Sequence, residues 1–163
     1  MDVVSLLPEA LRRTNGVHRQ FGTDQDRTIL SVGFLSYPES PPDPDRVLTF
    51  TYYGALLLLR GTGRYIGPDG CSVPLAPGCF IQRRPGIRHR TPVDPDSGWL
   101  ECYVCLGRPI YESLLAAGIP GIGEPVLAPG LDPGLVQRFV ALHGRLGARE
   151  TPSASCLADA VSL

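Results

Sequence analysis

Glycine and proline divide most of this chain into short segments. The 163 residues include 19 glycines and 17 prolines, and nearly all of them lie before residue 135. Clusters such as GPDG and DPDSG are typical of tight turns, because glycine reaches positive φ and proline restricts φ. Strands are expected between these turns at residues 28–36, 47–60 (with Gly54 as a point of interruption), 63–67, 71–75, 78–84, 88–93 and 98–106. Many short strands predict a mainly β sandwich or barrel.

Helical patterns follow the strands after Gly107. The segment 108–118 has a proline in its first turn and a glycine at its end, as short helices often do. A second helix is expected at 131–147, where Asp132 is a candidate N-cap, and a third at 151–163. Each carries an apolar stripe: Leu135, Phe139, Leu142 and Leu146 on the second, and Ala154, Leu157, Ala158 and Val161 on the third. We expect the first stripe to pack on the strands and the other to form an interface.

These patterns divide the chain into three regions. Residues 1–27 are expected to form a short helix and an extended arm, residues 28–107 the β barrel, and residues 108–163 a helical segment used in dimerisation. The last helix runs to residue 163 without a capping signal. We therefore expect the sequence to be truncated and to continue in the full-length protein.

The charge of the chain does not fit a domain whose main role is to bind nucleic acid. The net charge is −1 and the isoelectric point is about 6.3, whereas such domains are usually strongly basic. The densest basic run, RRPGIRHR at 83–90, is best explained as a turn between two strands, with Arg88, Arg90 and one of Arg83 or Arg84 on the outer face. An odd number of cysteines, no signal peptide and no apolar run of membrane-spanning length predict a cytoplasmic protein without a membrane partner.

One long segment resembles a known family. Residues 60–89, RGTGRYIGPDGCSVPLAPGCFIQRRPGIRH, together with Trp99 and the later helices, resemble the N-terminal cupin-type domain of AraC-family transcription regulators. The resemblance implies a double-stranded β-helix, or jelly-roll, barrel that holds a small effector and is followed by two to three helices used in dimerisation. Full-length members bind DNA through a C-terminal pair of helix-turn-helix motifs, and no such region is present in these 163 residues.

The alternative is a stand-alone cupin enzyme, such as a metal-dependent isomerase or dioxygenase. Such enzymes hold their metal with two or three histidines and a carboxylate, whereas His89 is the one histidine within the predicted barrel. Cys102 and Cys105 are three residues apart in a predicted strand and should point to opposite faces. We therefore expect no metal, no cofactor and no catalytic residues, and no enzymatic activity.

Alternation along the strands identifies candidate pocket residues. Trp99, Glu101, Tyr103 and Cys105 should share one face of their strand, and His89 should face inward together with Thr91. The resemblance implies that Arg46, Thr91, Glu101 and Tyr103 contact the effector. Strand alternation adds Trp99 and His89 as candidates beside them. Two alternatives stay open: Arg46 and Glu101 could pair in the empty pocket, or Trp99, Tyr103 and His89 could be ordinary core residues with Glu101 on the surface.

These observations favour an effector-sensing and dimerisation domain of a bacterial AraC-type regulator. Its effector would be a small polar molecule, sugar-like or a small acid, because guanidinium, carboxylate and phenol groups all bind polar groups. The chain would form a homodimer through its C-terminal helices and would reach DNA through the missing region alone. A purely structural dimerisation domain with a closed core is the third possibility.

Overall fold

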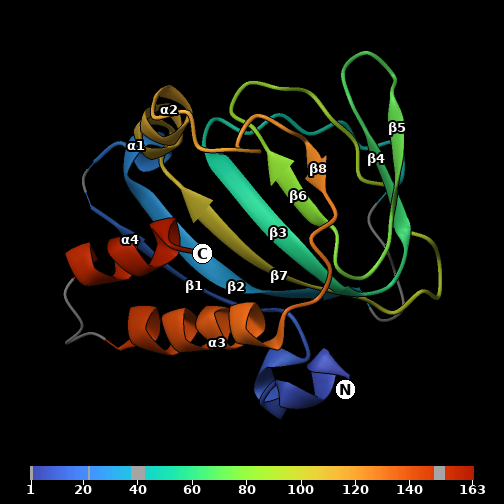
Figure 1. Ribbon diagram of the computed structural model, residues 1–163, viewed down its shortest axis with the longest axis horizontal. Coiled ribbons are helices and arrows are strands. Elements are labelled where there is room, and N and C mark those ends of the chain that lie inside the picture. Colours follow the sequence, from blue (N-terminus) through green and yellow to red (C-terminus); the bar gives the residue numbers. More distant parts are fainter. Residues whose placement is uncertain (1, 22, 38–42, 149–152) are drawn as a thin grey trace.

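The longest apolar run of the sequence forms the middle of a large antiparallel sheet. The computed structural model describes residues 2–21, 23–37, 43–148 and 153–163 (Figure 1). Six strands form the large sheet in the order β1-β2-β7-β3-β6-β8, and two form a separate hairpin, β4-β5. The strands are β1 (Asn15–Gln20), β2 (Ile29–Tyr37), β3 (Tyr53–Arg60), β4 (Gly63–Ile66), β5 (Ser72–Leu75), β6 (Phe80–Arg83), β7 (Trp99–Leu106) and β8 (Val126–Leu127).

Most of the helices pack against one face of this sheet. They are the 3₁₀ turns η1 (Val3–Leu6) and η2 (Glu9–Leu11), and the helices α1 (Gln25–Thr28), α2 (Arg108–Ala116), α3 (Pro133–Gly147) and α4 (Ser153–Val161). Figure 1 shows α2, α3 and α4 at the left of the view and the β4-β5 hairpin at the right. Asp132 caps α3 as expected, since its side chain accepts a hydrogen bond of 2.8 Å from the backbone N–H of Gly134. The three C-terminal helices expected from the sequence are confirmed within the described residues, and the expected start of the third at residues 151–152 lies outside them.

Both faces of the sheet are buried, and the side chains of β3 and β7 alternate between two apolar clusters. The helix-side cluster contains Tyr53, Ala55, Leu57 and Leu59 of β3 and Leu100, Cys102, Val104 and Leu106 of β7. The second cluster contains Leu56, Leu58 and Trp99. Burial on two faces explains why the sequence of β3 is a continuous apolar run rather than an alternating one. Phe139, Leu142 and Leu146 of α3 are buried in the helix-side cluster, so their stripe packs on the strands as predicted.

Two of the expected strands differ from the structure. Residues 88–93 form no regular strand; they make isolated bridges from His89 to Leu48, from Arg90 to Ile66 and from Val93 to Gly63. Pro92, which has no N–H to donate, interrupts this segment. The expected strand 47–60 begins only at Tyr53, so its interruption lies before Gly54 rather than at it.

The N-terminal region contributes a strand that the sequence did not predict. Residues 15–20, expected as an extended arm, form the edge strand β1 and pair with β2 from Asn15↔Phe34 to Gln20↔Ile29. The expected short helix before it is divided into the turns η1 and η2, with Pro8 between them. Within the described residues, no helix is both long enough and apolar enough to cross a membrane.

Candidate functional site

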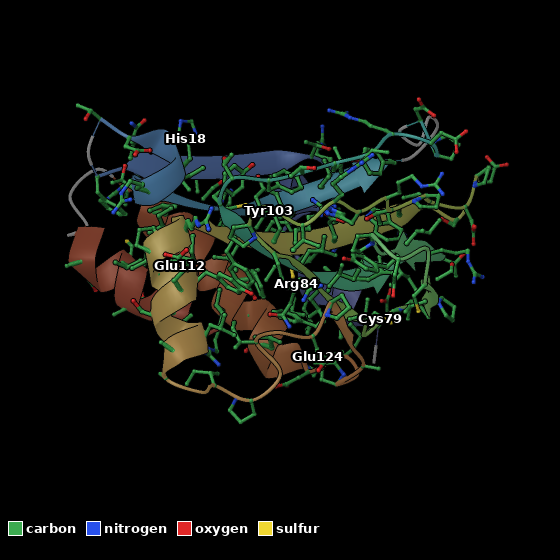
Figure 2. The ribbon with its side chains drawn as sticks, turned by 90° about the horizontal axis from the view of Figure 1, so that it is seen from above. His18, Cys79, Arg84, Tyr103, Glu112 and Glu124 are labelled. Atoms are coloured by element: carbon green, nitrogen blue, oxygen red, sulfur yellow. The ribbon has the colours of Figure 1, made fainter. Side chains whose placement is uncertain are left out.

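A cavity of about 250 Å³ lies on the face of the large sheet that is turned away from α3. Its lining comes from β2, β3, β6, β7 and the segment that leads into β3. Figure 2 shows Tyr103, one of these residues, near the middle of the molecule within the layer of strands. The twelve lining residues are Ile29, Ser31, Leu35, Phe50, Tyr52, Gly54, Ala55, Leu56, Arg83, Glu101, Tyr103 and Cys105.

Glu101 is the buried acid of this cavity. Its side chain is 1% exposed, and its Oε2 accepts a hydrogen bond of 2.7 Å from the indole N–H of Trp99. Its other oxygen, Oε1, is buried and has no hydrogen-bond partner. Burial raises the pKa of Glu101 above its ordinary value, while the charge of Arg83 and the hydrogen bond from Trp99 act in the opposite direction. A buried acceptor without a partner is rare in native structures, and it marks this oxygen as a place where a ligand could bind.

Arg83 supplies the positive charge of the cavity. It lies on β6, and its guanidinium carbon is 5.6 Å from the centre of the Phe50 ring, in a cation–π arrangement. Its Nε is buried and has no hydrogen-bond partner. The ion pairs of the described residues do not include one between Arg83 and Glu101. The two opposite charges therefore line one cavity without neutralising each other by direct contact.

Tyr103 and Cys105 complete the β7 side of the cavity. Burial raises the pKa of Tyr103, and a hydrogen bond with Ser31 partly opposes this effect. Burial also raises the pKa of the Cys105 thiol to about 12, so this thiol stays protonated and is a poor nucleophile. The sulfur of Cys102 lies on the opposite face, 3.9 Å from the carbonyl oxygen of Leu57. The prediction that Cys102 and Cys105 point to opposite faces is confirmed.

The structure places Arg46 outside the cavity. Its side chain is exposed, because it follows the exposed turn at residues 43–45. The alternative in which Arg46 pairs with Glu101 does not hold, because the ion pairs of the described residues do not include that one. The charge of Arg46 acts instead on Tyr37 at the end of β2. Burial raises the pKa of Tyr37, Glu101 raises it further, and Arg83 and Arg46 lower it. The guanidinium of the cavity is thus Arg83, which the sequence analysis did not select.

His89 and Thr91 also lie outside the cavity lining. The buried ring of His89 stacks between Phe50 and Tyr65, with a centroid separation of 5.7 Å on each side. Its Nδ1 is 3.2 Å from the carbonyl oxygen of Ile87, and burial lowers its pKa. The hydroxyl of Thr91 is buried without a hydrogen-bond partner. His89 therefore contacts the cavity residue Phe50, and the charge of the cavity residue Arg83 also lowers its pKa.

The outer-face assignments of the basic run are partly wrong. Arg88 is exposed, and Arg90 forms an ion pair of 2.8 Å with Asp45. Arg83 and Arg84 are both half-buried, since Arg83 lines the cavity and Arg84 donates a hydrogen bond of 2.8 Å to the carbonyl of Gly123. The turn did not decide which of these two arginines faces outward. Ile81 of β6 points into the second cluster, and because residues two apart in a strand share a face, Arg83 points to the same side.

Among the described residues, no three His, Cys, Asp or Glu side chains stand close enough together to hold a metal ion. The five cysteines, at positions 71, 79, 102, 105 and 156, are free thiols.

Comparison with known proteins finds similar structures but no similar family. No protein-family model matches the chain, and no curated protein matches its sequence. Apo ToxT from Vibrio cholerae aligns with a TM-score of 0.53 at 10% identity, over 85% of this chain and 53% of ToxT. A cupin protein from Bacteroides fragilis aligns with a TM-score of 0.40 at 15% identity, over 55% of this chain and 84% of that protein. The DMSP lyase DddQ from Ruegeria pomeroyi aligns with a TM-score of 0.37 at 16% identity, over 62% of this chain and 51% of the lyase.

The fold class predicted from the sequence is confirmed. The chain is mainly an antiparallel β structure with C-terminal helices. At such low identity the match with ToxT concerns the fold alone, and this chain spans about half the length of ToxT.

Proposed function

We propose that this chain is the effector-sensing domain of a bacterial AraC-type transcription regulator and that the effector binds in the cavity between Arg83 and Glu101. The main support is the buried side chain of Glu101, which lines the cavity and has one oxygen, Oε1, without a hydrogen-bond partner. The resemblance of residues 60–89 to that family supports the proposal, as does the similarity of fold to ToxT, an AraC-family regulator. The domain binds its effector without chemical conversion, and it acts as a homodimer joined to a DNA-binding region.

Tyr103 gives a physical route from the cavity to the helices. Its hydroxyl lies against the backbone of Gly16 on β1 and Gly33 on β2. Strand β1 is in turn tied to α3, because Arg19 Nε donates a hydrogen bond of 3.0 Å to the carbonyl of Leu146. A ligand that moves Tyr103 therefore shifts β1 against α3. In this proposal, ligand occupancy selects between two arrangements of the helical segment.

The fourth helix is the proposed dimer contact. Cys156 and Ala160 point into the helix-side cluster, while Ala154, Ala158 and Val161 are exposed on the other side of α4. These three residues belong to the apolar stripe expected from the sequence to form an interface. The fourth, Leu157, is partly buried against the helix-side cluster. Light scattering over a range of concentrations tests it, and a monomer at every concentration would contradict the contact for this chain.

Thermal denaturation with a panel of small molecules tests the proposed binding site. The panel includes sugars, amino acids, amines and small aromatic acids, and at least one compound should raise the melting temperature. Gly54→Ala adds a methyl group inside the cavity, 3.7 Å from both Arg83 Cβ and Cys105 Sγ, so it should weaken this stabilisation without a clash. Gly144→Ala is the matched control, because its Cβ would meet nothing within 4 Å in α3. A panel without any stabiliser, or a shift unchanged by Gly54→Ala, would contradict the proposal.

A further inference from the structure

The cavity contains two charged groups that need different partners. Arg83 and Glu101 are the charged residues among its twelve lining residues. Glu101 Oε1 is an acceptor without a donor, and Arg83 Nε is a donor without an acceptor. Both atoms are buried, where an unpaired polar group is costly. A ligand that satisfies both must itself carry a donor and an acceptor.

The charges of Arg83 and Glu101 limit which kinds of ligand would fit the cavity. A simple anion would pair with Arg83 but would be repelled by an ionised Glu101, and a simple cation would pair with Glu101 but face Arg83. A neutral sugar would supply hydrogen bonds but would leave two buried charges without counter-charges. A molecule with one positive and one negative group compensates both, and its two charge-assisted hydrogen bonds are stronger than neutral ones.

The rest of the lining sets the size and character of the ligand. Phe50, Tyr52 and Tyr103 supply aromatic surface, and Ile29, Leu35 and Leu56 supply aliphatic surface. The volume of about 250 Å³ is small for a ligand pocket, since typical pockets range from about 300 to 1,000 Å³. These dimensions suit a compact molecule with a short apolar part.

We propose that the effector is a zwitterion of amino-acid size, with its ammonium group on Glu101 Oε1 and its carboxylate on the guanidinium of Arg83. This inference rests on the proposed sensing function, and it assigns the chemical class of the effector. Glu101 is held in place by Trp99 and Arg83 by Phe50, so both groups are oriented before the ligand enters.

Calorimetric titration with matched compounds tests this class. The probes are the free L-amino acids, β-alanine and γ-aminobutyrate, each compared with its N-acetyl derivative and its methyl ester. At least one free zwitterion should bind, and blocking either charge should weaken binding by at least about tenfold, the loss expected for one charge-assisted bond. Binding of a sugar or of a simple acid in preference to every zwitterion would overturn the class but leave the sensing function standing. Failure of every compound, sugars and acids included, would count against the sensing function itself.

Two substitutions with matched controls locate the contacts. Glu101→Gln should weaken the zwitterion by at least about tenfold but leave its N-acetyl derivative nearly unaffected, and Arg83→Gln should do the same for the methyl ester. Glu112→Gln and Arg88→Gln remove the same charges from exposed positions and should leave all affinities unchanged. Near-ultraviolet circular dichroism confirms that each variant is folded. Equal losses for the blocked and the free compounds would overturn the assignment.

Discussion

The hydroxyl of Tyr103 occupies the space that a side chain at Gly16 would need. A Cβ at residue 16 would clash with this hydroxyl, while its next neighbours, Tyr103 Cζ and Val32 O, would be 3.5 and 3.9 Å away. The two residues are on different strands, β7 and β1, so the absence of a side chain at Gly16 lets the tyrosine reach across β2. A strand from the N-terminal region thereby forms part of the support of the cavity.

Gly16→Ala should destabilise the protein, and Tyr103→Phe should remove that effect. Forcing a methyl group into an occupied space costs about 1–3 kcal/mol in the free energy of unfolding. When Tyr103 is replaced by Phe, the ring atom nearest to a Cβ at residue 16 is at an ordinary contact distance. Gly16→Ala should then change the free energy of unfolding very little. Urea unfolding of the four proteins of this double-mutant cycle measures the coupling. Simple additivity of the two substitutions would contradict the described contact.

The stability difference between the native protein and Glu101→Gln should depend on pH. Burial raises the pKa of Glu101 in the folded state above its ordinary value of 4.5, so the folded state holds this proton more tightly than the unfolded state. The resulting contribution to stability is complete below pH 4.5 and is lost as the pH rises through the folded-state pKa. The unsubstituted protein should therefore lose stability relative to the Glu101→Gln variant as the pH rises from 4.5.

Urea unfolding at a series of pH values between 4 and 8 would measure this difference, with Glu112→Gln as a control for an exposed carboxylate. Arg83 and Trp99 oppose the rise in the pKa of Glu101. The charge of Glu101 also acts on four other titratable groups, Tyr37, Tyr103, Cys102 and Cys105. Their pKa values are all raised, so they stay uncharged over this pH range. A stability difference that is flat or increases with pH would show that the pKa of Glu101 is not raised in the folded state.

Arg46→Gln should have little effect on ligand affinity. Arg46 is exposed and lies outside the cavity, so its loss should change the dissociation constant by less than about twofold, as is usual for surface charges. Arg83→Gln, by contrast, removes a cavity group. Titration of both variants with the same compound separates the two arginines. A larger loss for Arg46→Gln would restore the role that the sequence resemblance assigned to it.

Gln82→Met should destabilise the helix-side face of the sheet. The buried Gln82 accepts a hydrogen bond of 2.7 Å from the hydroxyl of Tyr53 and donates bonds of 2.6 and 2.7 Å to the carbonyls of Gly121 and Glu124. Methionine has a similar volume but no polar groups. Each buried group left without a partner costs about 1–3 kcal/mol.

Adding Tyr53→Phe to Gln82→Met removes one of the unpaired groups and should recover part of the loss. Urea unfolding measures the total effect, and hydrogen exchange of residues 119–125 should show faster opening of the segment that Gln82 anchors. Unchanged exchange in this segment would mean that Gln82 does not hold it.

Local sequence patterns predicted which side chains share a face of a strand, but not which strands lie next to one another in the sheet. Period-two alternation correctly placed Glu101, Tyr103 and Cys105 on one face of β7, because that pattern depends only on the pleat of a single strand. The choice of Arg83 over Arg46 depends on how β6 and β7 flank β3, with Ala55 paired to both Gln82 and Val104. Such register is a long-range property that alternation alone does not determine.

The other differences have a similar origin. β1 has alternating burial but few apolar residues, so its pairing with β2 depends on the partner strand rather than on its own composition. Residues 88–93 look like a strand in sequence, yet they bridge to Leu48 on one side and to β4 on the other, with Pro92 between the contacts. In both cases tertiary contacts determine the local structure.

The hydrogen bond between Trp99 and Glu101 links the intrinsic tryptophan fluorescence of the protein to the cavity. Trp99 is the one tryptophan in the sequence, and its indole N–H is bonded directly to the carboxylate that faces the cavity. Because indole emission responds to the polarity and charge at its nitrogen, any change in the protonation or occupancy of Glu101 should alter the intrinsic fluorescence of the whole chain. Effector binding can thus be followed in the unlabelled protein, at wavelengths where the six tyrosines are not excited.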